Sequence, residues 1–347
     1  MKTVLRLAKG MYTVITVALK ATPEGRFVEL DERWIFYLHE SIVGGSVRAA
    51  ADKLNVNPSA ISRQIVHLEQ AVGASLMERH SKGVRATEAG ELVLDYYRRR
   101  RADHDDTLSR IEDIKGLRRG HISLALGEGF IDTIAAGPLA RFWKRYPEIS
   151  LNVEVTSTND VARLLLEDAV HIGLIYNPPK EPRLRTHSVA LQPVRVIARA
   201  DHPFAALGRP LDITELLDQR IAQLQHSYGI RQIIDNATHI SGLRIPAAVT
   251  TSSISMLKNF VEHGGGITLA PSFVAANEIQ SGKFVAVPLR HNVLDASMHV
   301  MSRLGRQLPS AATMVLRQIG REFRRLEAAD DSLRAANKPH GASYTND

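Results

Sequence analysis

The chain has 347 residues, of which 44% are hydrophobic and 23% are charged, and it contains no cysteine. This composition is that of a globular protein, and the length exceeds one typical domain of roughly 150 residues. The lack of cysteine excludes disulfides, thiolate nucleophiles, iron–sulfur clusters and cysteine–zinc sites. A formal net charge of +7 is compatible with a polyanionic partner, although many unrelated proteins are equally basic.

The first thirty residues are expected to be an N-terminal extension, either disordered or produced by a start codon placed too early. Basic residues within 2–9 precede an apolar run at 11–19, a pattern that superficially resembles a secretory signal cleaved near Ala21. Thr13 and Thr16 interrupt the run, which favours the extension over the signal. No stretch reaches the about 18 consecutive apolar residues that a membrane-spanning helix needs.

Helical spacing of apolar residues, three and four apart, dominates the sequence from residue 31 to 120. After a first helix, a second runs from an N-cap at Ser46 to Leu54. A short turn follows, and Asn57 and Pro58 then restart a helix, as an N-cap residue followed by proline at the first helical position. A helix, a short turn and another helix predict a helix-turn-helix.

The third helix has two distinct faces. Ile61, Ile65 and Leu68 recur at intervals of four and three, so they fix one face to the core. On the opposite face, Arg63 can reach guanine O6 and N7 or a phosphate, while serines and the helix N-terminus suit phosphate oxygens. The candidate DNA-binding residues of this segment are Asn57, Pro58, Ser59, Ser62, Arg63 and His67.

A basic segment follows the third helix after Gly73. Residues 74–86 contain Arg79, Lys82 and Arg85 around Gly83, which predicts a hairpin wing that contacts the DNA backbone or minor groove. These three basic residues complete the candidate DNA interface. Taken alone, the pattern leaves open an ordinary helical hairpin with a solvated polar face.

A long helix is expected from a cap at Thr87 to Leu117. Thirty residues would reach about 45 Å, too far for one small domain to bury, so a partner helix is needed. Its apolar stripe comprises Leu92, Tyr96, Leu108, Ile111 and Ile114. The charged stretches 98–101 and 103–106 are predicted to be solvated, with the arginines available to DNA phosphates or intrahelical pairs. A metal site at 103–106 is disfavoured because consecutive helical residues point in different directions.

Beyond residue 120 the pattern changes to alternating strands and helices. Strands are expected at 121–127, 149–155, 170–176, 194–198, 220–224, 247–251, 267–270, 284–287 and 296–301. Helices are expected at 138–146, 159–168, 213–217, 229–236, 253–263, 272–280 and 311–328. The alternating order predicts a parallel sheet covered by helices. The polar tail at 329–347 is expected to be disordered.

Ligands of open parallel sheets bind beyond the carboxyl ends of the strands, so the loops there are the candidate effector site. Thr158 and Ser252 are predicted to lie at helix starts, where free backbone N–H groups can hold a carboxylate; these two and Thr156 are favoured. A cap without a ligand is an equal alternative for each hydroxyl, and His202 also fits a structural loop role. The full candidate set is Glu128, Phe130, Thr156, Ser157, Thr158, Tyr176, His202, Gln225, Ser227, Thr251 and Ser252.

The string GSVRAAADKLNVNPSAISRQIVHLEQAVGASLMERHSKGVRATEAGE resembles the N-terminal domain of LysR-type transcriptional regulators. The matching positions are Ala49, Ala50, Leu54, Ser59, Ser62, Arg63, Leu68, Glu69, Gly73, Leu76, Arg79, Thr87 and Gly90. The resemblance continues through GHISLAL, RADHPFA and VEHGGGITLAPSFVA, and it covers about residues 31–326. Met77, Ala86 and the Gly44-Gly45 pair depart from the family pattern at the level of packing.

The resemblance implies an N-terminal all-α winged helix-turn-helix, a long linker helix for dimerisation, and a C-terminal α/β domain of two lobes like those of periplasmic binding proteins. The expected boundaries are 1–30 for the extension, 31–90 for the DNA-binding domain, 91–118 for the linker, 121–193 with 289–328 for the first lobe, 194–288 for the second, and 329–347 for the tail. The implied protein is a regulator in the cytoplasm, associated with the nucleoid through DNA. Its implied partners are double-stranded operator DNA, a small and often anionic organic effector, further copies in a homodimer or homotetramer, and RNA polymerase.

Two other classes of protein fit the sequence less well. A periplasmic solute-binding protein would share the two-lobed half, but it would leave residues 46–90 without a purpose. An enzyme lacks an anchor, because the sequence has no G-x-S-x-G elbow, P-loop, H-E-x-x-H or strand-linked G-x-G-x-x-G. We therefore expect no catalysis, no cofactor and no metal.

Overall fold

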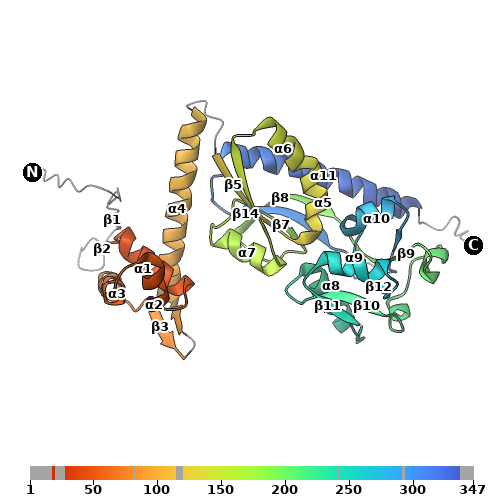
Figure 1. Ribbon diagram of the computed structural model, residues 1–347, viewed down its shortest axis with the longest axis horizontal. Helices are drawn as coiled ribbons and strands as arrows, with labels where there is room; N and C mark the ends of the chain where they lie inside the picture. The colour runs from red at the N-terminus through yellow and green to blue at the C-terminus, as the bar shows by residue number, and fades with distance from the viewer. Residues whose placement is uncertain are drawn as a thin grey trace, which may run out of the picture. The chain divides into compact units, whose positions relative to one another are not determined.

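The computed structural model describes residues 18–19, 28–81, 83–114, 120–240, 242–290 and 294–336. They form two compact units, 1–102 and 103–347 (Figure 1). Within the predicted extension, β1 (Ala18–Leu19) pairs antiparallel with β2 (Val28–Glu29). The expectation of disorder for residues 1–30 did not include this pair of strands. The secretory signal and its cleavage site lie outside the described residues. None of the described helices combines the length and apolar character that crossing a membrane requires.

Three helices build the first unit: α1 (Glu32–Val43), α2 (Val47–Leu54) and α3 (Pro58–Val72). The side chains of Asp31, Ser46 and Asn57 cap them by accepting backbone N–H groups of the first turn. The predicted helix-turn-helix is confirmed. Its core is a single apolar cluster whose fully buried members include Ile35, Leu38, Ala50, Ile61, Ile65, Leu68, Leu76 and Leu94.

The wing and the long helix follow as predicted. Strands β3 (Met77–His80) and β4 (Gly83–Ala86) pair as an antiparallel hairpin. Helix α4 (Glu88–Ile114) begins after Thr87, whose hydroxyl oxygen accepts the Gly90 N–H at 3.0 Å. The sequence placed the end of this helix at residue 117, which lies outside the described residues.

The first lobe contains a sheet in the order β6-β5-β7-β14-β8. Strands β5 (Gly120–Leu126), β6 (Ile149–Val155) and β7 (Ile172–Tyr176) are parallel, whereas β14 (Ser297–Arg303) runs antiparallel to β7 and to β8 (Leu184–Leu191). The predicted parallel pairing is thus correct for β5, β6 and β7, but β14 runs in the opposite direction between β7 and β8. The sequence did not predict β8, and β14 returns from a part of the chain more than a hundred residues away.

Helices cover both faces of this sheet, with α7 on one side and α11 on the other (Figure 1). They are η1 (Glu128–Phe130), α5 (Ile131–Ile134), the π-helical turn η2 (Ala135–Leu139), α6 (Ala140–Arg145), α7 (Thr158–Leu166) and α11 (Ser310–Ala336). The sequence placed the first helix start at Pro138, but helical structure begins directly after β5. Pro138 sits inside a widened turn, where its missing N–H is tolerated.

The second lobe repeats this mixed design in the order β11-β10-β12-β9-β13. Strands β10 (Ile221–Leu224), β11 (Val249–Thr251) and β12 (Ile267–Pro271) are parallel, and β9 (Val194–Arg199) runs antiparallel to β12 and to β13 (Phe284–Val287). Its helices are η3 (Pro203–Ala206), η4 (Ile213–Leu216), α8 (Gly229–Ile240), α9 (Ile254–Glu262), η5 (Ser272–Ala275) and α10 (Ala276–Gln280).

The last helix is longer than predicted. The sequence ended it near residue 328 and expected disorder from 329, but α11 continues to Ala336. Asp330 explains the extension, because its carboxylate pairs with the Arg195 guanidinium of β9 at 3.0 Å, with both side chains buried. Residues 337–347 lie outside the described residues.

One prediction for the charged stretch at 103–106 is wrong. Asp106 is 3% exposed rather than solvated. Its carboxylate lies 3.5 Å from His171 Nε2 and 3.4 Å from Arg306 Nε within the second unit. Burial follows from this helix turn packing on basic groups of the first lobe, partners that are too distant in sequence to be inferred. The neighbouring residues Asp103 and Asp105 are exposed, as expected.

Candidate DNA interface and effector site

Helix α3 is anchored on one side and free on the other. Ile61, Ile65 and Leu68 are at most 1% exposed. Ser59, Arg63, Val66 and His67 are exposed on the opposite face, and Ser62 is half-buried. The predicted outward residues therefore share one rigid face, and a helix fixed in this way can enter a major groove without rearrangement.

The start of α3 shows which predicted contacts also serve the fold. The Asn57 carboxamide oxygen accepts the Ser59 backbone N–H and the Ser59 hydroxyl, each at 2.9 Å. Pro58 occupies the first helical position. Asn57 and Pro58 thus define where the helix begins, whereas Ser62 and Arg63 lie one turn further along its outward face.

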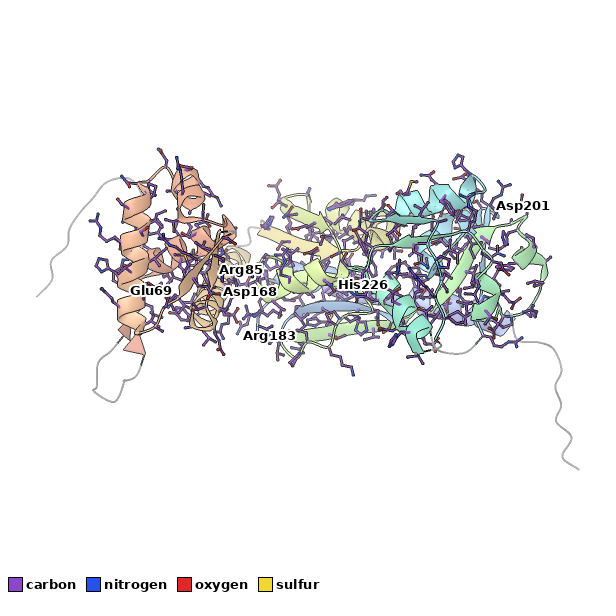
Figure 2. The ribbon with its side chains drawn as sticks, turned by 90° about the horizontal axis from the view of Figure 1, so that it is seen from below. Glu69, Arg85, Asp168, Arg183, Asp201 and His226 are labelled. Atoms are coloured by element: carbon purple, nitrogen blue, oxygen red, sulfur yellow. The ribbon has the colours of Figure 1, made fainter. Side chains whose placement is uncertain are left out.

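The base of the wing is tied to the other end of α3. Glu69 accepts the Leu76 backbone N–H at 2.8 Å and the Ser75 hydroxyl at 3.1 Å, and the Thr87 hydroxyl donates to the Ser75 carbonyl at 2.7 Å. Figure 2 shows Glu69 and Arg85 in this unit. Arg79 and Arg85 are exposed on the hairpin strands. The third predicted wing residue, Lys82, lies outside the described residues.

The tip of the wing is fixed by contacts that the sequence did not reveal. The Val84 N–H donates to the Gly45 carbonyl at 3.0 Å. A Cβ on Gly83 would lie 2.3 Å from that same oxygen, so only glycine permits the approach. The departure from the family pattern at Gly44-Gly45 therefore coincides with a contact between wing and α1–α2 turn.

The second candidate site is a hollow of about 30 Å³ between the two lobes, which is room for one or two water molecules. It is formed by the loop after β5, the end of β7 and the start of α7 from the first lobe. The second lobe adds the end of β10, the starts of α8 and α9, and η5. The lining residues are Gly127, Glu128, Gly129, Phe130, Thr158, Leu174, Tyr176, Leu224, Tyr228, Gly229, Ile230, Ile254, Phe273 and Val274.

Four of the predicted effector residues line this hollow: Glu128, Phe130, Thr158 and Tyr176. The remaining seven lie elsewhere around the loops: Thr156, Ser157, His202, Gln225, Ser227, Thr251 and Ser252. All four of these residues belong to the first lobe. The prediction for the second lobe did not include the residues that line the hollow.

His202 lies away from the hollow because β9 is reversed. The rule of carboxyl ends holds for parallel strands, and β9 runs antiparallel to β12, so its carboxyl end lies at the opposite edge. Figure 2 places Asp201 toward the outer end of the unit and His226, after β10, nearer its middle. The His202 ring instead accepts the Phe204 N–H at 3.2 Å and caps η3.

Thr158 is the first residue of α7, as predicted, whereas α9 begins at Ile254, two residues after Ser252. Ser157, not Thr158, caps α7, and Ser253, not Ser252, caps α9. Asp160 accepts the Ser157 hydroxyl at 2.8 Å and the Thr156 hydroxyl at 3.4 Å. The Ser157 hydrogen bond, together with Arg163, holds the pKa of Asp160 below its usual value. Thr156 and Ser157 therefore serve the start of α7.

Thr158 and Gly229 join the two lobes at close range. The Thr158 hydroxyl oxygen accepts the Gly229 N–H at 2.8 Å. A Cβ on Gly229 would lie 2.0 Å from the Tyr176 carbonyl oxygen, so a side chain here would force the lobes apart. No local sequence pattern predicts this contact, because Tyr176 and Gly229 are more than fifty residues apart in the chain.

The loop after β12 was also missed, although the rule used for the other strands applies to it. Strand β12 is parallel to β10, and the segment after it supplies Phe273 and Val274 to the hollow. The Phe273 ring lies 5.2 Å from that of Phe130 and 6.2 Å from that of Tyr176. This aromatic group makes the floor of the hollow apolar.

Two tyrosines line the hollow with their hydroxyls already engaged. Tyr176 donates to the Gln192 carbonyl at 2.6 Å, and Tyr228 donates to the Ser252 carbonyl at 2.9 Å. Burial raises the pKa of both phenols, and the Glu128 charge adds to the effect at Tyr228. Both residues are therefore neutral at pH 7.

Glu128 crosses from η1 to the start of α9. Its carboxylate accepts the Ile254 N–H at 2.6 Å, the Ser255 N–H at 3.0 Å and the Ser255 hydroxyl at 2.9 Å. The Ser253 hydroxyl is 3.3 Å away. Within the described part of the chain, no group of histidines and acidic residues is arranged to hold a metal ion.

A winged helix-turn-helix unit followed by a two-lobed α/β unit defines a class of DNA-binding regulatory proteins. Residues 33–91 match the bacterial regulatory helix-turn-helix proteins of the lysR family, and residues 115–324 match the LysR substrate binding domain. Since the second match alone covers more than half of the chain, the protein belongs to the LysR family of transcriptional regulators. The periplasmic solute-binding alternative is overturned, because the first match accounts for the segment it left without a purpose.

Relatives named as transcriptional regulators agree with this assignment. The probable RuBisCO transcriptional regulator of Cyanidioschyzon merolae is 28% identical over 257 residues, which cover 72% of this chain and 84% of the relative. The RuBisCO operon transcriptional regulator of Allochromatium vinosum is 26% identical over 267 residues, which cover 77% of this chain and 88% of the relative.

Solved structures share the fold. A variant of full-length OxyR from Pseudomonas aeruginosa matches with a TM-score of 0.58 and 19% identity, over 83% of this chain and 93% of that one. Full-length CbnR in complex with its target DNA gives 0.53 and 18%, over 84% and 100%. The regulatory domain of Synechocystis PCC6803 CcmR in complex with 2-PG gives 0.51 and 21%, over 65% and 100%.

Proposed function

We propose that this regulator binds double-stranded operator DNA through the outward face of α3 and through the wing. The observation that carries the proposal is the fixed orientation of α3, whose buried residues Ile61, Ile65 and Leu68 leave Ser62 and Arg63 facing outward. Arg63 reads guanine or holds a phosphate, while Arg79 and Arg85 add backbone contacts. The CbnR complex with target DNA supports this use of the fold.

We further propose that a small organic effector binds between the two lobes, at the hollow around Glu128, Thr158 and Tyr176. The hollow is too small in this form for a molecule of several heavy atoms, so it must widen to bind one. A change in lobe closure or in subunit rotation then alters the spacing of the winged units on DNA. The CcmR regulatory domain complexed with 2-PG supports a ligand role for this domain.

The proposed assembly is at least a homodimer. Leu92, Leu108 and Ile111 are 69%, 50% and 42% exposed on α4, and exposed apolar side chains along a long helix suit contact with a second linker helix. Paired units would read half-sites separated by whole helical turns of DNA. A homotetramer, contact with RNA polymerase, association with the nucleoid and the absence of catalysis complete the proposal.

The test is a genome-wide map of bound DNA, followed by footprinting of the recovered sites with purified full-length protein. Metabolites of neighbouring genes would be screened by thermal shift, and hits added to the footprint. The proposal expects a protected palindromic site and a footprint or bend angle that changes with the effector. Identical footprints and bend angles with and without a bound effector would reject the regulatory mechanism.

A further inference from the structure

The N-terminus of α9 is already occupied by a negative charge from the other lobe. The first N–H groups of a helix have no partners within the helix and attract anions. In this cleft, the Glu128 carboxylate accepts the N–H groups of Ile254 and Ser255 at 2.6 and 3.0 Å. The hydroxyls of Ser253 and Ser255 lie 3.3 and 2.9 Å from the same oxygen of Glu128. Four donors thus surround one carboxylate.

The hollow beside this contact offers nothing to neutralise a second anion. Among the described residues that line it, Glu128 alone carries a charge, and the others are glycine, threonine, tyrosine or apolar residues. The hydroxyls of Thr158, Tyr176 and Tyr228 already take part in hydrogen bonds. An anion placed here would meet the Glu128 charge across an apolar wall, where repulsion is weakly screened.

The nearest cation on the same helix is directed elsewhere. Lys258 follows Ile254 by one helical turn, but its ammonium lies 2.9 Å from the Glu278 carboxylate and 3.6 Å from that of Asp132. Burial lowers the pKa of Lys258, but the two carboxylates outweigh it, so the pKa is raised overall. Lys258 does not line the hollow.

We propose that Glu128 determines the ligand class of this cleft by occupying the place where a carboxylate or phosphate would bind. The ligand is accordingly an uncharged small molecule with an apolar body, and free anions are rejected. This inference rests on the proposed effector role of the cleft and deepens it, because it names the ligand class and the residue that selects it. An anion can bind only after Glu128 leaves α9 and exposes the Ile254 and Ser255 N–H groups.

The test follows the backbone amide signals of Ile254 and Ser255 by NMR in full-length protein at pH 7.5. The probes are inorganic phosphate, isobutyrate and its uncharged analogue isobutyramide. In the unaltered chain we expect neither anion to shift these signals. In Glu128→Gln and Glu128→Ala, both anions should shift them saturably, with a gain in affinity of at least about tenfold.

Isobutyramide distinguishes an effect of ligand charge from an effect of the space available in the cleft. Its affinity should change less than about twofold between the unaltered chain and Glu128→Gln, because that substitution keeps the side-chain volume while removing the charge. The matched control is Asp132→Asn, which removes a nearby first-lobe carboxylate that does not touch the N-terminus of α9. It should leave the anion response unchanged.

The proposal is overturned if the unaltered chain binds either anion as well as the variants do, or if neither variant responds to anions. It is also overturned if Asp132→Asn gains anion binding equally, or if isobutyramide gains as much as isobutyrate. The measurement needs no DNA, so its failure leaves operator binding standing. Conversely, if the protein gives no footprint on operator DNA, the NMR measurement still tests anion binding in the cleft.

Discussion

The two units of this protein differ in whether the residues proposed for binding also stabilise the fold. In the DNA-binding unit, Arg63 projects from a helix whose other face supplies the core, so the reading surface and the buried residues are separate. In the two-lobed unit, Glu128 and Gly229 line the hollow and also hold the lobes together. From this contrast we expect that outward residues of α3 can be replaced without cost to the fold, whereas a side chain added at Gly229, in the proposed ligand site, changes lobe closure.

The largest expected effect tests the buried face of α3. Ile61→Ala removes a side chain that is 0% exposed, and it should lower the free energy of unfolding of the first unit by about 2–5 kcal/mol. Hydrogen exchange at the α3 amides would measure this loss, and operator affinity should fall with it. The matched control, Val66→Ala, alters a side chain that is 47% exposed on the other face and should change stability by less than about 0.5 kcal/mol.

The next effect tests the close approach of the lobes. Gly229→Ala places a Cβ 2.0 Å from the Tyr176 carbonyl oxygen. It should destabilise the second unit by about 1–3 kcal/mol, because the backbones must separate to admit it. Thermal unfolding would measure the loss.

Gly137→Ala is the control for that prediction, since outside its own helix the nearest atom to its added Cβ would be Glu322 Oε2 at 3.6 Å. Equal effects of Gly229→Ala and Gly137→Ala would show that the lobes do not depend on this contact. If Gly229→Ala also changes the cleft, the response of the Ile254 amide signal to added anions should differ from that of the unaltered chain.

The smallest effect concerns protons in the first lobe. Burial lowers the pKa of His299, whose Nε2 lies 2.8 Å from the Ser297 hydroxyl. A histidine with a lowered folded pKa contributes its full stability above about pH 6.5, and this contribution is lost as the pH falls below that value. Urea unfolding of the second unit should therefore show a stability that falls from pH 7 to pH 5.

Replacement of the ring sharpens this pH prediction. In His299→Gln the fall should be shallower, by less than about 1.4 kcal/mol per pH unit. A slope identical to that of the unaltered chain would mean that His299 does not gain its proton on unfolding in this range.

The sequence predicted the DNA-binding unit well because its signals are local. Ser46, Asn57 and Gly73 mark helix ends within a few residues, and the spacing of Ile61, Ile65 and Leu68 identifies the buried face. What it missed were contacts between distant segments, such as the wing tip on Gly45. No local pattern encodes such a pairing.

The candidate effector residues coincide with the lining of the hollow only in part, for the same reason. Glu128 was found because it follows a buried strand, but its partners on α9 lie more than a hundred residues away. His202 was placed among the candidates because strand direction cannot be deduced from an alternating pattern alone, and β9 runs antiparallel to its neighbour β12. The loop that carries Phe273 could have been found by applying the carboxyl-end rule to every strand.

The most direct test of the account is operator binding by Arg63→Ala, measured with the mapped operator and with a scrambled site at several salt concentrations. We predict an affinity lower by about 1–3 kcal/mol, with weaker discrimination between the two sites, and an unchanged unfolding transition. Arg244→Ala, the same change at an exposed position of the second unit, serves as the control. Unchanged affinity and selectivity in a folded Arg63→Ala protein would contradict the account.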